Sequence, residues 1–155
     1  MGSYDGLVGS YLLWQLPPNI KNRVDLYRDD GLGAFSETSQ QIERIKKEIC
    51  KKFSSNHLKI TIEANKKIVN FLDVTLDLQK KTYEPYSKPN DSPLYVHSDS
   101  NHPPSILRNI PVAVNRRLSE LSCNNESFCK AAPIYQRALD ESGYKHQLEF
   151  EPTRN

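Results

Sequence analysis

The hydrophobic positions in the first third of the chain are spaced differently from one segment to the next. Residues 5–16 are apolar at most positions and stop at Pro17, which predicts a helix that other elements cover on several sides. Between residues 42 and 53 the apolar side chains recur every three or four positions, which predicts an amphipathic helix. Thr38 and Gln41 just before it have the spacing of a capping box.

Alternating apolar and polar residues predict strands on both sides of this amphipathic helix. Residues 24–35 contain two short alternating arms around Asp30 and Gly31, a pair that favours a tight hairpin turn because both residues tolerate positive φ. Residues 58–64 and 72–78 alternate in the same way and predict two further strands joined by a turn.

The composition changes near residue 80. Residues 83–95 are rich in Pro, Asn, Asp and Ser and predict an extended connector. Residues 103–142 are predicted to be helical, with an interruption at Pro133 and an end at Gly143. The pattern therefore indicates an α+β protein, with antiparallel hairpins and packed helices in residues 1–80 and a connector and mainly helical region in residues 81–155.

Length and charge bound the function only loosely. The chain has 155 residues, 37% of them hydrophobic, which is enough for one ordinary domain or two small lobes. A formal charge of +2 is mildly basic and does not by itself favour nucleic acid. No apolar run approaches the length of a membrane span, and the N-terminus lacks the basic region of a secretory signal, so we expect no membrane partner.

The cysteines and histidines do not have the spacing of a metal site. Cys50, Cys123 and Cys129 are an odd number with no ligand spacing, which favours a reducing compartment, either nucleus or cytoplasm. His97 and His102 have no cysteine nearby, so they do not predict a zinc site.

Two adjacent acids, Asp29 and Asp30, are the strongest chemical signal. Neighbouring side chains on a strand point to opposite faces, so two such carboxylates can converge only at a turn. Convergent carboxylates can hold the Mg²⁺ ions used in phosphoryl transfer. The simpler interpretation is a solvated turn in which Asp is only a turn former, and this is the commoner case for an isolated Asp-Asp-Gly.

Other segments of the chain favour the metal-binding interpretation of these acids over the solvated turn. The Tyr-x-Asp-Asp form of residues 27–30 resembles the metal-binding signature of reverse transcriptases. Further segments are similar, in the same order, to stretches of the Penelope-like retroelements: residues 1–6, 58–63, 70–74, 100–105 and 115–118. The chain thus resembles the reverse transcriptase of a Penelope-like retroelement from residue 1 to about its end.

The resemblance implies an RNA-directed DNA polymerase, here the C-terminal half of a palm in residues 1–80 and part of a helical thumb in residues 81–155. Its partners would be an RNA template, a DNA primer and a deoxynucleoside triphosphate. Two Mg²⁺ ions would be bound by Asp29 and Asp30, together with a third carboxylate from an earlier palm strand. That strand is expected upstream of Met1, and the fingers are also absent from this chain. We therefore expect the chain alone to be inactive.

Two other acids could be considered as the third ligand. Asp25 lies a strand length away from Asp29 on the same arm, so it is not expected to converge on it. Asp5 follows the predicted Gly-Ser turn and would have to move several ångströms. Neither is a convincing substitute.

The resemblance also implies nucleotide-binding residues. Gly2 and Ser3 would line the nascent base pair, and Lys66, or its neighbour Lys67, would neutralise the departing pyrophosphate. Each has a simpler interpretation. The first two could belong to a disordered terminus, and a lysine in an exposed turn is commonly only solvated.

Residues that grip the primer and follow the duplex are implied as well. Phe71, Leu72 and Asp73 would belong to a hairpin at the primer end, although Phe and Leu in a strand are usually part of the core. Arg108, Arg116 and Arg117 would contact phosphates from the thumb.

Two interpretations from other functional classes stay open. One is a domesticated nucleic-acid-binding module that has kept the basic thumb and lost catalysis. The other is a non-catalytic remnant without function, marginally folded because its sheet lacks central strands.

Overall fold

The computed structural model describes residues 2–153, with the side chains of residues 2–7 outside that description. The chain forms two compact units, Met1–Lys67 and Ile68–Asn155. Each contains an antiparallel sheet and helices, so the predicted α+β class is confirmed. The division falls earlier than the composition change near residue 80, because the strands on both sides of that change pair with each other.

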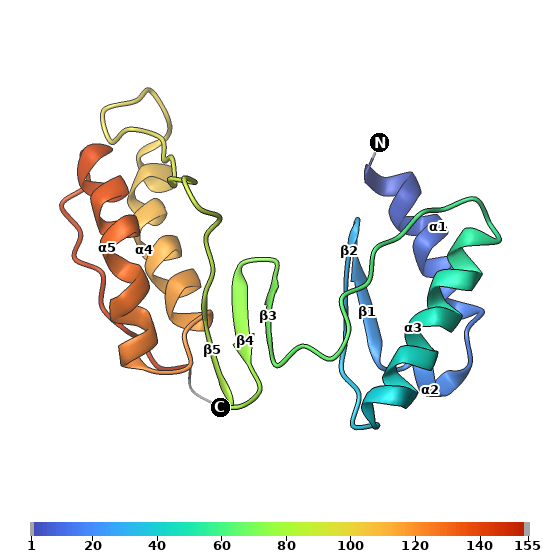
Figure 1. Cartoon of the computed structure of the whole chain (residues 1–155). Helices are drawn as coiled ribbons and strands as arrows, with labels where there is room; N and C mark the ends of the chain where they lie inside the picture. Colours follow the sequence, from blue (N-terminus) through green and yellow to red (C-terminus); the bar gives the residue numbers. More distant parts are fainter. Residues whose placement is uncertain (1, 154–155) are drawn as a thin grey trace. The chain divides into compact units, whose positions relative to one another are not determined.

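The first unit combines helices with a two-stranded hairpin (Figure 1). Its elements are α1 (Gly2–Trp14), α2 (Pro18–Lys21), β1 (Val24–Tyr27), β2 (Asp30–Gly33) and α3 (Ser39–Ser54). Helix α1 contacts both β1 and α3. A Cβ atom placed on Gly9 would lie 3.6 Å from Leu26 Cδ1, so α1 packs closely on the hairpin. The buried apolar residues among those described in this unit are Leu12, Leu16, Ile20 and Phe53.

Helix α3 begins as predicted. The Thr38 hydroxyl accepts a hydrogen bond from the Gln41 backbone N–H at 3.3 Å, and Gln41 Oε1 accepts one from the Thr38 backbone N–H at 3.0 Å. This capping box satisfies two donors at the start of the helix. Phe53 in its last turn is buried, whereas Arg44 and Lys47 are exposed, which confirms the amphipathic pattern.

The predicted strand at residues 58–64 is wrong. This segment makes no strand pairing, although half-buried and exposed residues alternate along it as the sequence pattern suggested. The periodicity correctly indicated an extended backbone with one covered face, but it could not indicate whether a partner strand was present. Asn65, with φ at 58°, then turns the chain before the second unit begins.

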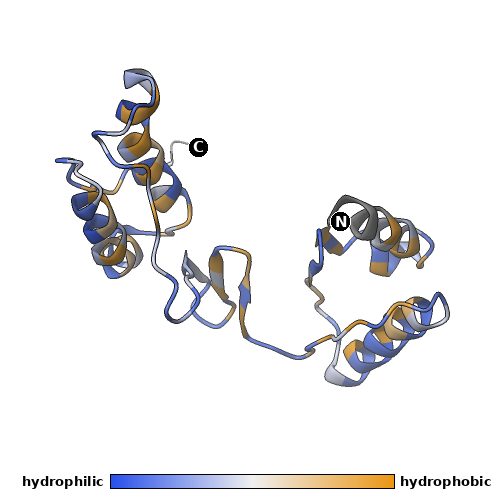
Figure 2. Cartoon of the chain, turned by 90° about the horizontal axis from the view of Figure 1, so that it is seen from above, coloured by the Kyte–Doolittle hydropathy of each residue, from blue (hydrophilic) through white to orange (hydrophobic). Residues whose placement is uncertain are grey.

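The second unit is a three-stranded antiparallel sheet followed by two helices. Its elements are β3 (Ile68–Phe71), β4 (Val74–Asp77), β5 (Thr82–Pro85), α4 (Pro104–Glu120) and α5 (Asn125–Glu141), and the strand order is β3-β4-β5. Helix α5 packs on both β5 and α4 (Figure 1). In Figure 2 the ribbons of α4 and α5 each contain both hydrophobic and hydrophilic residues.

Two sequence predictions for this unit need correction. The predicted strand at residues 72–78 is shorter, because Leu72 and Asp73 form the turn between β3 and β4. Strand β5 lies in what was predicted to begin a connector. Pro85 is tolerated in it because β5 is an edge strand of the sheet.

Prolines within the helices do not end them. Pro133 was predicted to interrupt the last helix, but α5 continues through it, and Pro111 lies within α4 in the same way. Each proline removes one intrahelical hydrogen bond, which packing against neighbouring elements has to offset. Gly143 ends α5 as predicted, with φ at 84° and its N–H bonded to the Asp140 carbonyl at 3.0 Å.

Residues 144–153, which we call the C-terminal strap, are fastened to both helices. The N–H of Glu149 donates to Asn115 Oδ1 at 2.8 Å, and the N–H of Glu151 donates to Ser119 Oγ at 3.1 Å. Asn115 and Ser119 on α4 are buried. On the α5 side the Phe150 ring lies 5.7 Å from that of buried Phe128, centroid to centroid. The strap therefore closes the unit with both hydrogen bonds and aromatic packing.

Candidate functional site

The acidic hairpin of the first unit turns two positions earlier than predicted. Tyr27 pairs with Asp30, so Arg28 and Asp29 form the two-residue turn and Gly31 lies within β2. Arg28 has φ at 52°, so the arginine takes the left-handed conformation that the sequence suggested for Asp and Gly. Asp29 and Asp30 are both exposed, one in the turn and one at the first position of β2.

Gly31 fits into the hairpin because it has no side chain. It pairs with Leu26, and a Cβ atom at Gly31 would lie 2.8 Å from Leu26 Cδ2. Gly33 is similarly placed opposite Val24, where a Cβ atom would come within 3.1 Å of Val24 Cγ2. On one face of the hairpin, the apolar side chains of β1 therefore lie opposite glycines of β2, which have no side chains. This face packs against α1.

The opposite face contains the acids. The register places Asp25, Tyr27 and Asp30 on this side, with Asp25 and Asp30 as diagonal neighbours across the two strands. All three are exposed, and the Arg28 guanidinium lies 5.6 Å from the centroid of the Tyr27 ring. The hairpin thus brings Asp25 to the same face as Asp30, which was not expected when Asp25 was compared with Asp29 alone.

A divalent ion needs several oxygen ligands that meet at one point. Within residues 2–153, excluding the side chains of residues 2–7, no three His, Cys, Asp or Glu residues are grouped closely enough to hold a metal ion. Asp29 and Asp30 can therefore supply part of a ligand set but do not by themselves fit a two-metal centre. Their exposure leaves them accessible to ligands from other chains or solvent.

The predicted nucleotide-binding residues are not brought together with the acids by any contact that the structure describes. Gly2 and Ser3 are the first two residues of α1, so the predicted turn at this point is wrong, and their side chains lie outside the described part. Lys66 and Lys67 are exposed in the extended segment before β3.

The predicted primer-gripping residues do lie at a hairpin. Phe71 ends β3, and Leu72 follows it in the turn with φ at 54° and with its side chain 42% exposed. Asp73, the other turn residue, accepts a hydrogen bond from Arg117 Nη2 at 3.1 Å. This ion pair joins the β3–β4 turn to α4 and engages one of the three predicted phosphate-contacting arginines.

A shallow cavity of about 350 Å³ adjoins the same turn. Its walls include Leu72, Asp73 and the half-buried Tyr86 and Tyr135. Tyr135 Oη lies 3.3 Å from Ser87 Oγ. Nothing in the spacing of these residues along the sequence could have indicated that they line one cavity, because they come from a loop, a turn and α5.

The cysteines and the histidine-containing loop were not predicted to bind metal. Cys50, Cys123 and Cys129 carry free thiols. His97 Nδ1 lies 3.8 Å from Asp99 Oδ2, and Ser100 Oγ lies 2.9 Å from His102 Nδ1. Burial, followed by the charge of Tyr135, raises the pKa of the nearby Tyr95 to about 12.

Arg108 and Arg116 lie on the side of α4 that faces solvent. The same side contains two residues that the sequence interpretation did not single out, Asn109 and Val112, and both are exposed. The signal that could have found them is helical spacing, since positions 105, 109, 112 and 116 fall on one side of a helix.

Comparison with known proteins gives one family match. Residues 94–153 match the animal helix-turn-helix domain, a region that spans α4, α5 and the C-terminal strap. No curated protein and no solved structure matches the chain. No helix in residues 2–153 combines the length and the apolar character that crossing a bilayer requires.

Proposed function

We propose that this chain is part of an RNA-directed DNA polymerase, a reverse transcriptase of Penelope-like type, with residues 1–80 in its palm and residues 81–155 in its thumb. The observation that supports this most is the β1–β2 hairpin, in which Asp29 lies in the two-residue turn and exposed Asp30 begins the returning strand. An exposed acidic turn on a short hairpin is the geometry that the Tyr-x-Asp-Asp motif requires to approach a cation.

The hairpin would be one side of the catalytic centre. Two Mg²⁺ ions, when bound, would stabilise charge on the attacking and leaving oxygens of nucleotide addition. Asp29 and Asp30 would provide carboxylate oxygens, while the Arg28 guanidinium lies over the Tyr27 ring. Because the described residues provide no third group, the full ligand set would require a carboxylate from another palm strand. The partners would be template RNA, primer DNA and a deoxynucleoside triphosphate, in the nucleus or cytoplasm.

Metal binding at the hairpin can be tested with paramagnetic Mn²⁺ on the whole isotope-labelled chain. We expect Mn²⁺ to broaden the backbone amide signals of residues 28–31 in NMR spectra, and Asp29→Asn with Asp30→Asn to abolish the effect. Asp140 and Glu141 on α5 are a matched control, since they are also adjacent exposed carboxylates. Equal broadening at both pairs would contradict the proposal, because it would show that any adjacent acids suffice.

Catalysis is tested separately by primer extension with Mg²⁺ on an RNA template. We expect no nucleotide incorporation by this chain alone, since two carboxylates do not offset the repulsion of two close dications. Incorporation that Asp29→Ala abolishes would contradict the expected inactivity and would establish the hairpin as catalytic.

A second candidate function is nucleic-acid binding without catalysis. It is favoured by the helix-turn-helix match and by the exposed arginines of α4. Such a module would bind with an affinity that falls steeply with salt, because contacts to phosphates release counterions. Its binding would be unchanged by Asp29→Ala and by removal of Mg²⁺.

A further inference from the structure

Helix α4 presents a polar and basic surface to solvent. We call Ser105, Arg108, Asn109, Val112 and Arg116 the α4 exposed face; all five are exposed, and Val112 has 47% of its surface accessible. Ser105, Asn109, Val112 and Arg116 recur at intervals of four, three and four residues, so they form one stripe along the helix, and Arg108 lies at its edge.

Contacts on the buried side of α4 fix the orientation of this stripe. Pro111, Asn115 and Leu118 are buried on a different side of α4 from Asn109, Val112 and Arg116. Asn115 and Ser119 also accept hydrogen bonds from the C-terminal strap. Rotation of α4 about its axis would break these bonds and expose buried side chains, so the α4 exposed face is held outward.

Charge distinguishes α4 from α5. In helix-turn-helix proteins the second helix usually reads DNA. Here the second helix is net acidic on its exposed positions, which include Glu126, Lys130, Arg137, Asp140 and Glu141. Lys130 is moreover bonded to Glu84, with Nζ 3.1 Å from Oε1. Helix α4 has three arginines, of which Arg117 is paired with Asp73, against one acid, Glu120, at its last position. Phosphates would therefore be attracted to α4 and repelled by α5.

The spacing along α4 fits a DNA groove. Arg108 and Arg116 are two turns apart, which at 1.5 Å per residue is about 12 Å, similar to the width of the B-form major groove. Between them lie Asn109, whose amide can pair with an adenine edge, and Val112, whose methyl groups can contact a thymine methyl.

We propose that α4, and not α5, enters the major groove of double-stranded DNA, with Arg108 and Arg116 on the bordering phosphates and Asn109 and Val112 on base edges. The proposal deepens the nucleic-acid-binding role described above and rests on it, but it does not depend on the acidic hairpin. An RNA–DNA hybrid is a poorer partner because the deep, narrow major groove of an A-form helix does not admit side chains.

The test measures affinity of the whole chain for three probes of one sequence: a DNA duplex, an RNA–DNA hybrid and a single DNA strand. We expect the DNA duplex to bind most tightly. Arg108→Ala with Arg116→Ala should lower the slope of log affinity against log salt by about 1.8. The unaltered chain would then lose roughly twelvefold more affinity than this variant between 50 and 200 mM salt, as follows from that slope.

The matched control removes two bases from the other helix. Lys130→Ala with Arg137→Ala should leave the slope unchanged, and circular dichroism should show both variants to be folded. An equal loss of slope in the two variants, or equal binding of hybrid and DNA duplex, would overturn the assignment to α4. Absence of binding to all three probes would overturn the nucleic-acid-binding role itself as well.

Base contact is tested by selecting preferred sequences from a random duplex pool. Asn109→Ala should keep the salt slope and lose the preference for adenine at one position. Identical preferences before and after this substitution would overturn the base contact. The Asp29→Asn and Asp30→Asn variant should bind the duplex normally, so failure of the polymerase proposal can be distinguished from failure of this one.

Discussion

The two units differ in the polar groups that they bury. In the first unit large aromatic side chains are exposed: Trp14 has 71% of its surface accessible, Tyr11 63% and Tyr27 51%. In the second unit polar side chains are buried, and Asn115 and Ser119 are bonded to the C-terminal strap. Large apolar side chains are also exposed in the second unit, Leu94 with 93% and Leu78 with 62% of the surface accessible, so the two units differ in their buried polar groups and not in how much apolar surface they cover.

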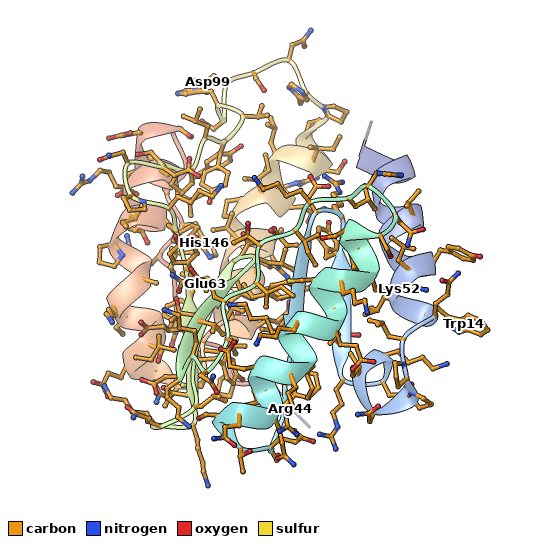
Figure 3. The ribbon with its side chains drawn as sticks, turned by 45° about the vertical axis from the view of Figure 1, so that its right-hand side comes forward. Trp14, Arg44, Lys52, Glu63, Asp99 and His146 are labelled. Atoms are coloured by element: carbon orange, nitrogen blue, oxygen red, sulfur yellow. The ribbon has the colours of Figure 1, made fainter. Side chains whose placement is uncertain are left out.

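This difference indicates where stability is concentrated. The second unit closes its core with its own strap, whereas in the first unit Trp14 projects outward from the end of α1 (Figure 3). Lys21 Nζ lies 4.7 Å from the centroid of this indole, which offsets only part of its exposure. We expect the first unit to unfold at a lower denaturant concentration, and Trp14, as the one tryptophan of the chain, reports on that unit alone.

The largest expected effect is on the core of the second unit. Phe128→Ala removes a side chain that is 2% exposed and packs against Phe150, and it should lower the free energy of unfolding of this unit by about 3–5 kcal/mol. Denaturant titration followed by circular dichroism measures the loss. Trp14 fluorescence should keep its midpoint. A shift of both signals would show that the units do not unfold separately. Exposed Ile134→Ala is the control and should change little.

A smaller effect, an increase in stability, is expected from replacing Pro133, the helix-interior proline that faces solvent. Pro133→Ala restores an N–H to bond the Cys129 carbonyl, so the second unit should become more stable by up to about 3 kcal/mol. Thermal unfolding monitored by circular dichroism measures it. Buried Pro111→Ala should gain less, because the smaller side chain also leaves a gap in packing. A loss of stability with Pro133→Ala would mean that the proline has a packing role.

The attachment of the strap is tested with one buried amide. Asn115→Ala removes the acceptor of the Glu149 N–H and should cost about 2 kcal/mol. Amide hydrogen exchange at Glu149 should become faster. Asn109→Ala, on the exposed side of the same helix, should leave this exchange rate unchanged. Unaltered protection at Glu149 in the first variant would contradict the closing role of the strap.

The smallest effect concerns the acidic turn. Arg28→Gly should relieve the left-handed backbone at φ 52° and stabilise the first unit by about 0.5 kcal/mol, since glycine also loses more chain entropy on folding. The midpoint of Trp14 fluorescence in a denaturant titration measures this gain. Arg28→Ala, which keeps the strain, should show no gain, and an equal gain in both variants would exclude strain as the cause.

Local chemistry was predictable where the signal lay within a few residues. Thr38 and Gln41 correctly predicted the start of α3, and Gly143 predicted the end of α5, because capping depends on neighbouring residues. The hairpin at residues 24–33 was predicted for a similar reason, although the Asp30-Gly31 pair placed its turn two positions too late. The tertiary demand for space above Gly31 outweighed its preference for a turn.

Features that depend on distant partners could not be predicted from the sequence. Residues 58–64 have the alternation of a strand, but pairing requires a neighbour that the local pattern cannot specify. Strand β5 was missed because its partner β4 supplies the hydrogen bonds that its own composition does not suggest. The diagonal approach of Asp25 to Asp30 depends on the register, which is known only once the turn is placed.

The glycines opposite Leu26 and Val24 limit how the length of the acidic hairpin can vary. Adding or deleting one residue in either arm would bring a larger side chain opposite Leu26 and would move Asp30 to the side of α1. Variants in which each arm gains or loses two residues would keep the alternation intact. Natural or engineered length variation that preserves this acidic turn should therefore occur in steps of two.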